Sequence, residues 1–179
     1  MSQQNIKQII KQEYLKCIKD PVYFMKKYCW IQHPTRGRIQ FNLYTFQEKV
    51  LSLLNKNERN IILKSRQLGI STLSAGMSLW YMLFQKDINV LVIATKQDTA
   101  KNLVTKVKFM YDGLPSWLKL GFVENNKLAL RLKNGSQIKA VSAASDAGRS
   151  EAISLLIIDE AAFMKEIELK KFGHHLNKQ

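Results

Sequence analysis

Apolar positions near the start of the chain follow helical spacing. Between residues 5 and 19 they recur every three or four positions, which predicts an amphipathic helix. Pro21 interrupts this pattern, and a proline at a first helical position predicts that a second, short helix begins there. Residues 31–42, IQHPTRGRIQFN, contain a proline and a glycine and predict a loop or a short hairpin. A third helix is expected over residues 43–57.

After these helices, short apolar runs alternate with helical segments, a pattern typical of an α/β fold. Two runs, INVLVIAT and ISLLIIDE, are almost continuously apolar, as in central parallel strands covered on both faces. Asn134 and Gly135 separate two alternating segments and predict a hairpin. The expected strands are 60–64, 89–95, 127–132, 137–143 and 154–159, and the expected helices are 70–84 and 99–114. We expect a mostly parallel sheet flanked by helices, with a helical N-terminal segment.

Composition restricts the class of protein. With 179 residues, 46% of them hydrophobic and 23% charged, the chain has the make-up of one globular domain. No apolar run approaches the roughly 20 residues that span a bilayer, so no membrane is expected among its partners. The polar, periodic N-terminus is unlike a secretory signal. Two distant cysteines predict neither a disulfide framework nor a structural zinc site.

The charge balance favours a polyanionic partner. The chain has 28 Lys and Arg residues against 14 Asp and Glu, a net charge of +14. Nucleic acid is the first candidate, because such an excess attracts phosphates. The alternative is a basic surface without a specific partner. The same choice applies to one basic segment, which is either a solvated helix face or a surface that follows DNA; its lysines are Lys96, Lys101, Lys106 and Lys108.

The stretch IILKSRQLGISTLSAG resembles a phosphate-binding loop, because an apolar run enters a glycine-containing turn and then a helix. The common motif G-x-x-x-x-G-K-[ST] places a lysine before the hydroxyl residue, where this chain has Ile70. Lys64 or Arg66 would supply the charge by folding back over the phosphates. Ser71 or Thr72 would supply a hydroxyl for magnesium. The alternative is a plain strand-turn-helix.

The run SLLIIDEAAF brings two acidic residues to the end of an expected strand. Ligands bind beyond the carboxyl ends of parallel strands. Asp159 is therefore a candidate magnesium residue and Glu160 a candidate general base for an attacking water. Neighbouring side chains on a strand diverge unless the backbone turns. The alternative is a strand that ends in an acidic helix N-cap.

Together these stretches carry a family resemblance. The order FQ, KSRQLGIST, VLVIATKQDTA, LPSWLK, LKNGSQIKAVSAASDAGRSEAISLLIIDEAAF, from about Tyr44 to Met164, resembles the ATPase domain of the large terminase subunit of tailed bacteriophages. The resemblance implies a P-loop NTPase of the ASCE or RecA-like type. It also implies ATP and Mg²⁺ as cofactors, and ATP hydrolysis that drives double-stranded viral DNA into a prohead.

The resemblance also implies roles for single residues. Gln47 would recognise adenine, Ser71 and Asp159 would meet magnesium, and Glu160 would be the catalytic carboxylate. The phosphate-binding loop would comprise Lys64, Ser65, Arg66, Gln67, Leu68, Gly69, Ile70, Ser71 and Thr72. Some family members carry the basic residue at the start of this loop, as Lys64 does here; Lys64 is otherwise a strand-end lysine that faces water.

Arg66 and Arg149 would sense or stabilise the γ-phosphate, within one subunit or across a subunit boundary. The alternative for Gln47 is an exposed polar residue of a helix, and for Arg149 an ordinary surface arginine.

The resemblance further implies a domain plan and partners. Residues 1–42 would form a helical, lid-like segment and residues 43–179 an ATPase core, truncated at its C-terminus and without a nuclease domain. Expected partners are DNA, the portal protein and the small terminase subunit. The chain would form a homo-oligomeric ring on the portal in the host cytoplasm and a monomer in isolation. The alternatives are a superfamily 2 helicase-like translocase, and a weakly catalytic remnant that binds DNA or a partner.

Overall fold

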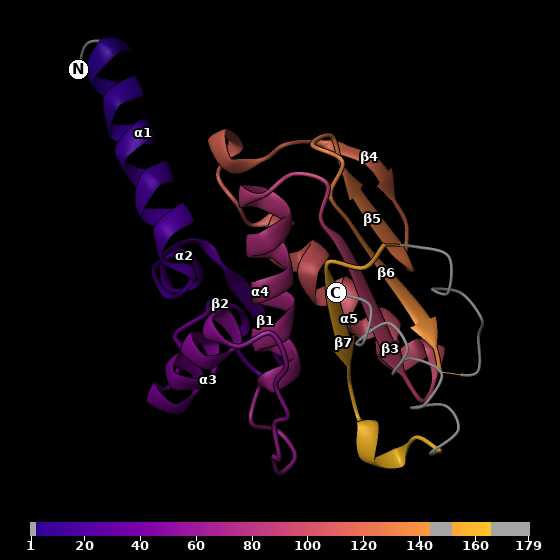
Figure 1. Cartoon of the computed structure of the whole chain (residues 1–179). Coiled ribbons are helices and arrows are strands. Elements are labelled where there is room, and N and C mark those ends of the chain that lie inside the picture. Colours follow the sequence, from indigo (N-terminus) through magenta and orange to yellow (C-terminus); the bar gives the residue numbers. More distant parts are fainter. Residues whose placement is uncertain (1–2, 144–151, 166–179) are drawn as a thin grey trace.

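Five α-helices and seven strands make up most of the computed structural model, which describes residues 3–143 and 152–165 (Figure 1). The α-helices are α1 (Gln3–Lys19), α2 (Pro21–Tyr28), α3 (Thr45–Lys56), α4 (Ile70–Phe84) and α5 (Gln97–Asp112). The strands are β1 (Trp30–His33), β2 (Gly37–Gln40), β3 (Asn89–Ala94), β4 (Phe122–Asn125), β5 (Ala129–Leu132), β6 (Gln137–Ser142) and β7 (Leu155–Ile158). Two 3₁₀ turns are η1 (Ser116–Leu118) and η2 (Ala161–Phe163).

The main sheet is mixed, which corrects the expectation of a mostly parallel one. Its order is β4-β5-β6-β3-β7. β3 runs parallel to both β6 and β7, whereas β4 with β5 and β5 with β6 are antiparallel. The antiparallel half exists because β4, β5 and β6 follow one another through short turns, and strands joined in this way pair antiparallel.

The turn between β5 and β6 confirms the predicted hairpin. Gly135 has φ +87°, a left-handed conformation that glycine adopts without strain. The Asn134 carboxamide donates to the carbonyl oxygens of Met82 and Gln85, both at 2.8 Å. This turn is therefore attached to the end of α4 and holds the antiparallel half of the sheet against that helix.

The main core lies between the sheet and the helices α4 and α5. On β3, Val90, Val92 and Ala94 face these helices, while Leu91 and Ile93 pack in a smaller cluster on the opposite face. β3 is thus the doubly covered central strand that its apolar run predicts. β7 is parallel to β3 but is the last strand in the described order, and all four of its residues are only half-buried. Its expected central position is wrong for the described sheet.

Residues 60–64 do not form the predicted strand. Ile61 and Leu63 are each 101% exposed, whereas Ile62 packs against the main core. Within the described part of the chain, this segment pairs with no strand. Because a strand needs a neighbour to take its backbone hydrogen bonds, a short apolar run alone is insufficient here.

The N-terminal segment packs on α4 through specific contacts. The Trp80 indole N–H donates to the Cys17 carbonyl oxygen at 2.7 Å, and the rings of Phe24 and Phe84 meet edge to face at 5.4 Å. β1 and β2 form the short antiparallel hairpin that was one of the two expected structures. The free end of α1 projects away from the body (Figure 1). No helix in the described residues is both long and apolar enough to cross a membrane.

Candidate functional site

The loop before α4 presents the start of a helix to solvent. Gly69 has φ +70° and Gln67 has φ +63°, and the N-cap position of α4 has no side-chain cap hydrogen bond. The side chains of residues 64–68 are exposed. Helix N-terminal N–H groups without a side-chain cap attract anions, so the start of α4 is a candidate phosphate site.

A direct contact joins the start of α4 to the end of β7. The Ser71 hydroxyl donates to Asp159 Oδ2 at 2.7 Å, across 88 positions of sequence. The other carboxylate oxygen of Asp159 accepts the backbone N–H of Glu160 at 3.0 Å. A carboxylate beside a hydroxyl is the kind of oxygen pair that Mg²⁺ accepts next to phosphates, so these residues fit the implied metal. Bound there, Mg²⁺ would neutralise charge on the phosphates.

The backbone turns sharply after Asp159. Glu160 has φ +58° and occupies the N-cap position of η2 without a side-chain cap hydrogen bond. Asp159 is therefore not the acidic N-cap of the alternative interpretation, because its carboxylate is used by Ser71 and by the Glu160 N–H. The Glu160 side chain is exposed. The turn frees the two acidic side chains from the opposite directions that a continuous strand would impose.

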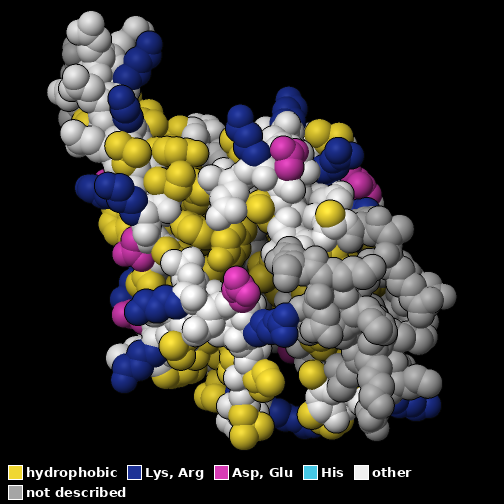
Figure 2. Space-filling model, viewed as in Figure 1, with side chains coloured by type: hydrophobic (Ala, Val, Ile, Leu, Met, Phe, Trp, Pro, Cys, Tyr) yellow, Lys and Arg dark blue, Asp and Glu magenta, His cyan; other side chains and the backbone are white. Residues whose placement is uncertain are grey.

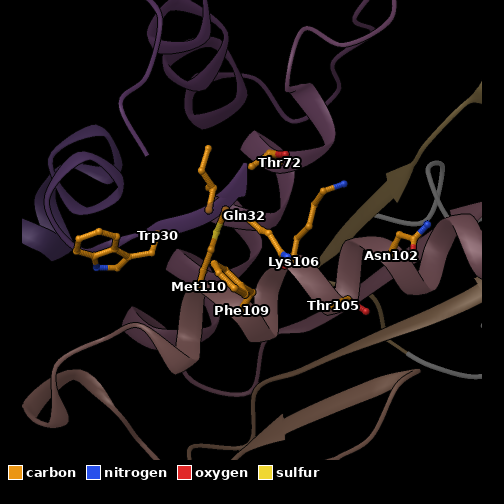
Figure 3. Close-up of a pocket in the computed structure, with 9 residues that line it drawn as sticks. Trp30, Gln32, Thr72, Asn102, Thr105, Lys106, Phe109 and Met110 are labelled. Atoms are coloured by element: carbon orange, nitrogen blue, oxygen red, sulfur yellow. The ribbon is translucent and has the colours of Figure 1, made fainter. Parts of the chain in front are cut away.

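Thr72 does not share the position of Ser71. It lines a cavity of about 290 Å³ between β1, the start of α4 and α5. Gln32 and Trp30 of β1 contribute to the same cavity, as does Lys106, whose side chain extends from α5 toward the start of α4 (Figure 3). Of the two hydroxyl residues proposed for magnesium, Ser71 is therefore the one beside the carboxylate. The cavity depends on tertiary packing of distant segments and has no signature in the sequence.

The basic residues of the loop differ from Ile70 in their surroundings. Ile70 is 7% exposed and belongs to the main core. Lys64 and Arg66 are exposed, and neither forms a hydrogen bond or ion pair with another described residue. Both are thus open to an anion at this loop, whereas the residue at the usual lysine position serves packing.

Gln47 is buried, so its alternative interpretation as an exposed helix residue is wrong. It is 2% exposed. Its Oε1 accepts the Tyr44 backbone N–H at 3.0 Å, and its Nε2 donates to the Leu68 carbonyl oxygen at 3.0 Å. The carboxamide therefore links the start of α3 to the phosphate-loop segment. Arg149 lies outside the described residues.

The lysines around α5 lie in different environments. Lys101 Nζ is 3.8 Å from Asp98, and Lys108 Nζ donates to Asn125 at 2.6 Å. Lysine and arginine side chains lie along α1, around α3 and near β4 on the visible face, and acidic side chains lie among them around α3 and near β4 (Figure 2). A DNA-following role for α5 stays a prediction.

Among the described residues, no three His, Cys, Asp or Glu side chains gather as a metal cluster.

Comparison with known proteins supplies the family. The family described as "Terminase large subunit, T4likevirus-type, N-terminal" matches residues 61–172, well over half of the chain. The chain belongs to this terminase large-subunit family. The matched residues include the phosphate loop, Ser71 and Asp159, whereas Gln47 lies before them.

A solved terminase shares the fold. The crystal structure of the HK97 bacteriophage large terminase matches 88% of this chain with a TM-score of 0.67 and 18% sequence identity. At this identity the likeness shows the fold alone. The terminase chain described here covers 35% of the HK97 protein.

Proposed function

We propose that this terminase region is an ATP-hydrolysing motor domain of the ASCE type, which powers the movement of double-stranded DNA into a prohead. The observation that carries the proposal is the 2.7 Å contact between Ser71 and Asp159. It brings the hydroxyl of a phosphate-loop helix to an acidic residue at a strand end, where phosphoryl-transfer enzymes hold magnesium. The exposed loop supplies the phosphate cradle.

Each part of the site has a role in this proposal. The backbone of residues 65–69 would bind phosphates, and Lys64 or Arg66 would neutralise their charge. Ser71 and Asp159 would hold Mg²⁺, and Glu160 would orient and deprotonate the attacking water. Arg149 is proposed to stabilise the γ-phosphate, as Arg66 is.

The proposed setting is the portal vertex of a prohead in the host cytoplasm. The partners are DNA, the portal protein and the small terminase subunit, with several copies arranged in a ring on the portal and single copies elsewhere. Residues 1–42 are proposed as a lid-like segment and the remainder as the ATPase core. A nuclease activity is not proposed for these residues.

One observation favours a second candidate. The buried Ile70 occupies the usual position of the phosphate lysine, which would leave a domain that binds DNA or a partner and hydrolyses ATP poorly. Nucleotide binding without turnover in the wild-type chain would support this candidate over the motor.

The first test compares Mg²⁺-dependent ATP binding and turnover in the wild-type chain, Lys64→Ala and Arg66→Ala. We expect at least one of these variants to bind ATP about tenfold more weakly, because hydrogen bonds to charged groups are the stronger ones. Lys56→Ala, at the end of α3, is the matched control and should bind as the wild type does. Unchanged binding in both loop variants would contradict the proposed role of the relocated charge.

A further inference from the structure

We infer that Gln47 is a positioning residue of the phosphate loop: its carboxamide ties the loop to the core-anchored helix α3. This inference rests on the proposed nucleotide-binding role of the loop. The amide orientation follows from its partners, because the Tyr44 N–H only donates and the Leu68 carbonyl only accepts. The Gln47 side chain is 2% exposed, so its carboxamide could contact a nucleobase only by giving up its hydrogen bonds to Tyr44 and Leu68.

The loop approaches the carboxamide so closely that a side chain at Gly69 would have to displace it. A Cβ atom at Gly69 would lie 2.7 Å from Gln47 Nε2. Gly69 also has φ +70°, a conformation that other residues adopt only with strain. The contact therefore restrains the residue directly before α4, where the first free N–H groups of the helix point into the proposed phosphate site.

The two ends of this link differ in how firmly they are held. Leu51, one helical turn after Gln47, is completely buried in the main core and fixes α3. Residues 64–68 are exposed. Among the described residues, Gln47 is the one whose side chain forms a hydrogen bond to this segment. A helix anchored in the core through Leu51 thus holds an otherwise exposed loop by one amide, which is how a positioning residue acts.

Gln47→Glu breaks one half of the link. It keeps an oxygen for the Tyr44 N–H but places a carboxylate oxygen against the Leu68 carbonyl. The first readout needs no nucleotide: trypsin cleavage after Lys64 and Arg66 should become about fivefold faster, as loss of one hydrogen bond implies. Gln40→Glu is the matched control, because the Gln40 amide also donates to backbone carbonyls, those of Lys26 and Lys27, and should leave loop cleavage unchanged.

The second readout separates positioning from base recognition. Mg²⁺-tripolyphosphate has no base, so a positioning role predicts that Gln47→Glu weakens its binding by the same factor as that of Mg²⁺-ATP. Weaker ATP binding with unchanged tripolyphosphate binding and unchanged cleavage would overturn the inference in favour of base reading. Unchanged values in every assay would overturn it as well.

Gly69→Ala disrupts the same contact from the loop side. It keeps the inference testable if Gln47→Glu fails to fold. Cleavage after Arg66 should accelerate here too, because the new Cβ displaces the carboxamide. Unchanged cleavage in Gly69→Ala would contradict the inference. If the wild-type chain binds neither ligand, the proposed function fails, while the cleavage rates still decide whether Gln47 holds the loop.

Discussion

At the level of single residues, three neighbours in the candidate site have different surroundings. Ile70 packs in the core, Ser71 meets Asp159, and Thr72 lines a separate cavity. Successive residues of a helix point about a quarter turn apart, so three adjacent positions reach three different surroundings. A lysine at position 70 would therefore begin in the core and not over the loop.

This placement predicts the outcome of Ile70→Lys. Restoring the common motif should lower the free energy of unfolding by roughly 2 kcal/mol, because apolar packing is lost and a charge is brought toward the core. In thermal unfolding, that corresponds to a fall in Tm of roughly 4–8 °C. Ile70→Leu, which keeps the volume, is the control and should lose less. If Ile70→Lys were as stable as Ile70→Leu and hydrolysed ATP faster, the assignment of Ile70 to core packing would be contradicted.

Some contacts of the candidate site could be anticipated from sequence and others could not. Ser71 and Asp159 are recognisable because local patterns, a glycine turn before a helix and acids after an apolar run, mark their chemistry. The burial of Gln47 was missed, since a polar residue near a helix start is more often exposed. Its partner Leu68 lies 21 positions away, and only the folded chain brings the two together.

At the scale of elements, α1 is attached to α2 by a polar cluster around one carboxylate. Glu13 accepts hydrogen bonds from Lys27 Nζ at 2.7 Å and from the hydroxyls of Tyr23 and Tyr28, each at 2.8 Å. These donors, Lys27 foremost, hold the pKa of Glu13 well below its ordinary value, and Glu13 in turn raises the pKa of Lys27. Both groups are therefore charged near neutral pH.

The lowered pKa fixes the direction of a pH effect. A carboxylate with a depressed pKa stabilises the fold above its unfolded pKa of about 4.3 and loses this contribution as the pH falls below it. The wild type should therefore unfold at a higher Tm than Glu13→Gln at pH 7, and the difference should shrink progressively below about pH 4. Thermal unfolding of both proteins between pH 7 and pH 3 measures it; a difference independent of pH would rule out this contribution of Glu13.

Helices and turns marked by local sequence patterns were predicted better than the order in which the strands pair. α4 begins and ends where its helical pattern indicates, and the Asn134-Gly135 turn joins β5 to β6 as expected. Residues 60–64 carry a strand-like pattern but are not in the described sheet, and β7 lies at its edge. Strand order depends on contacts between distant segments, which alternation of apolar residues does not encode.

At the scale of the whole molecule, the net charge of +14 governs encounters with polyanions. Basic side chains are spread over the visible face and do not form one stripe (Figure 2). Such a distribution favours sequence-independent contacts with DNA phosphates, which release bound counterions. Such contacts would suit the proposed motor, which would have to advance along any sequence.

The charge predicts salt-sensitive binding to double-stranded DNA. Between 50 and 200 mM salt, the affinity for a labelled duplex should fall roughly tenfold or more, measured by fluorescence anisotropy. Duplexes of unrelated sequence serve as the control and should bind alike. Binding that is insensitive to salt, or restricted to one sequence, would contradict a backbone-following role.

We propose that this terminase region hydrolyses ATP with Glu160 as the general base. The most direct measurement is Mg²⁺-dependent ATP binding and turnover in the wild type, Glu160→Gln and Glu124→Gln, the last an exposed control on β4. We expect turnover in the wild type and the control. In Glu160→Gln we expect at least a roughly 100-fold loss of turnover with ATP binding retained. Equal turnover in all three proteins would contradict the assignment of Glu160, and no turnover in any of them would contradict the motor itself.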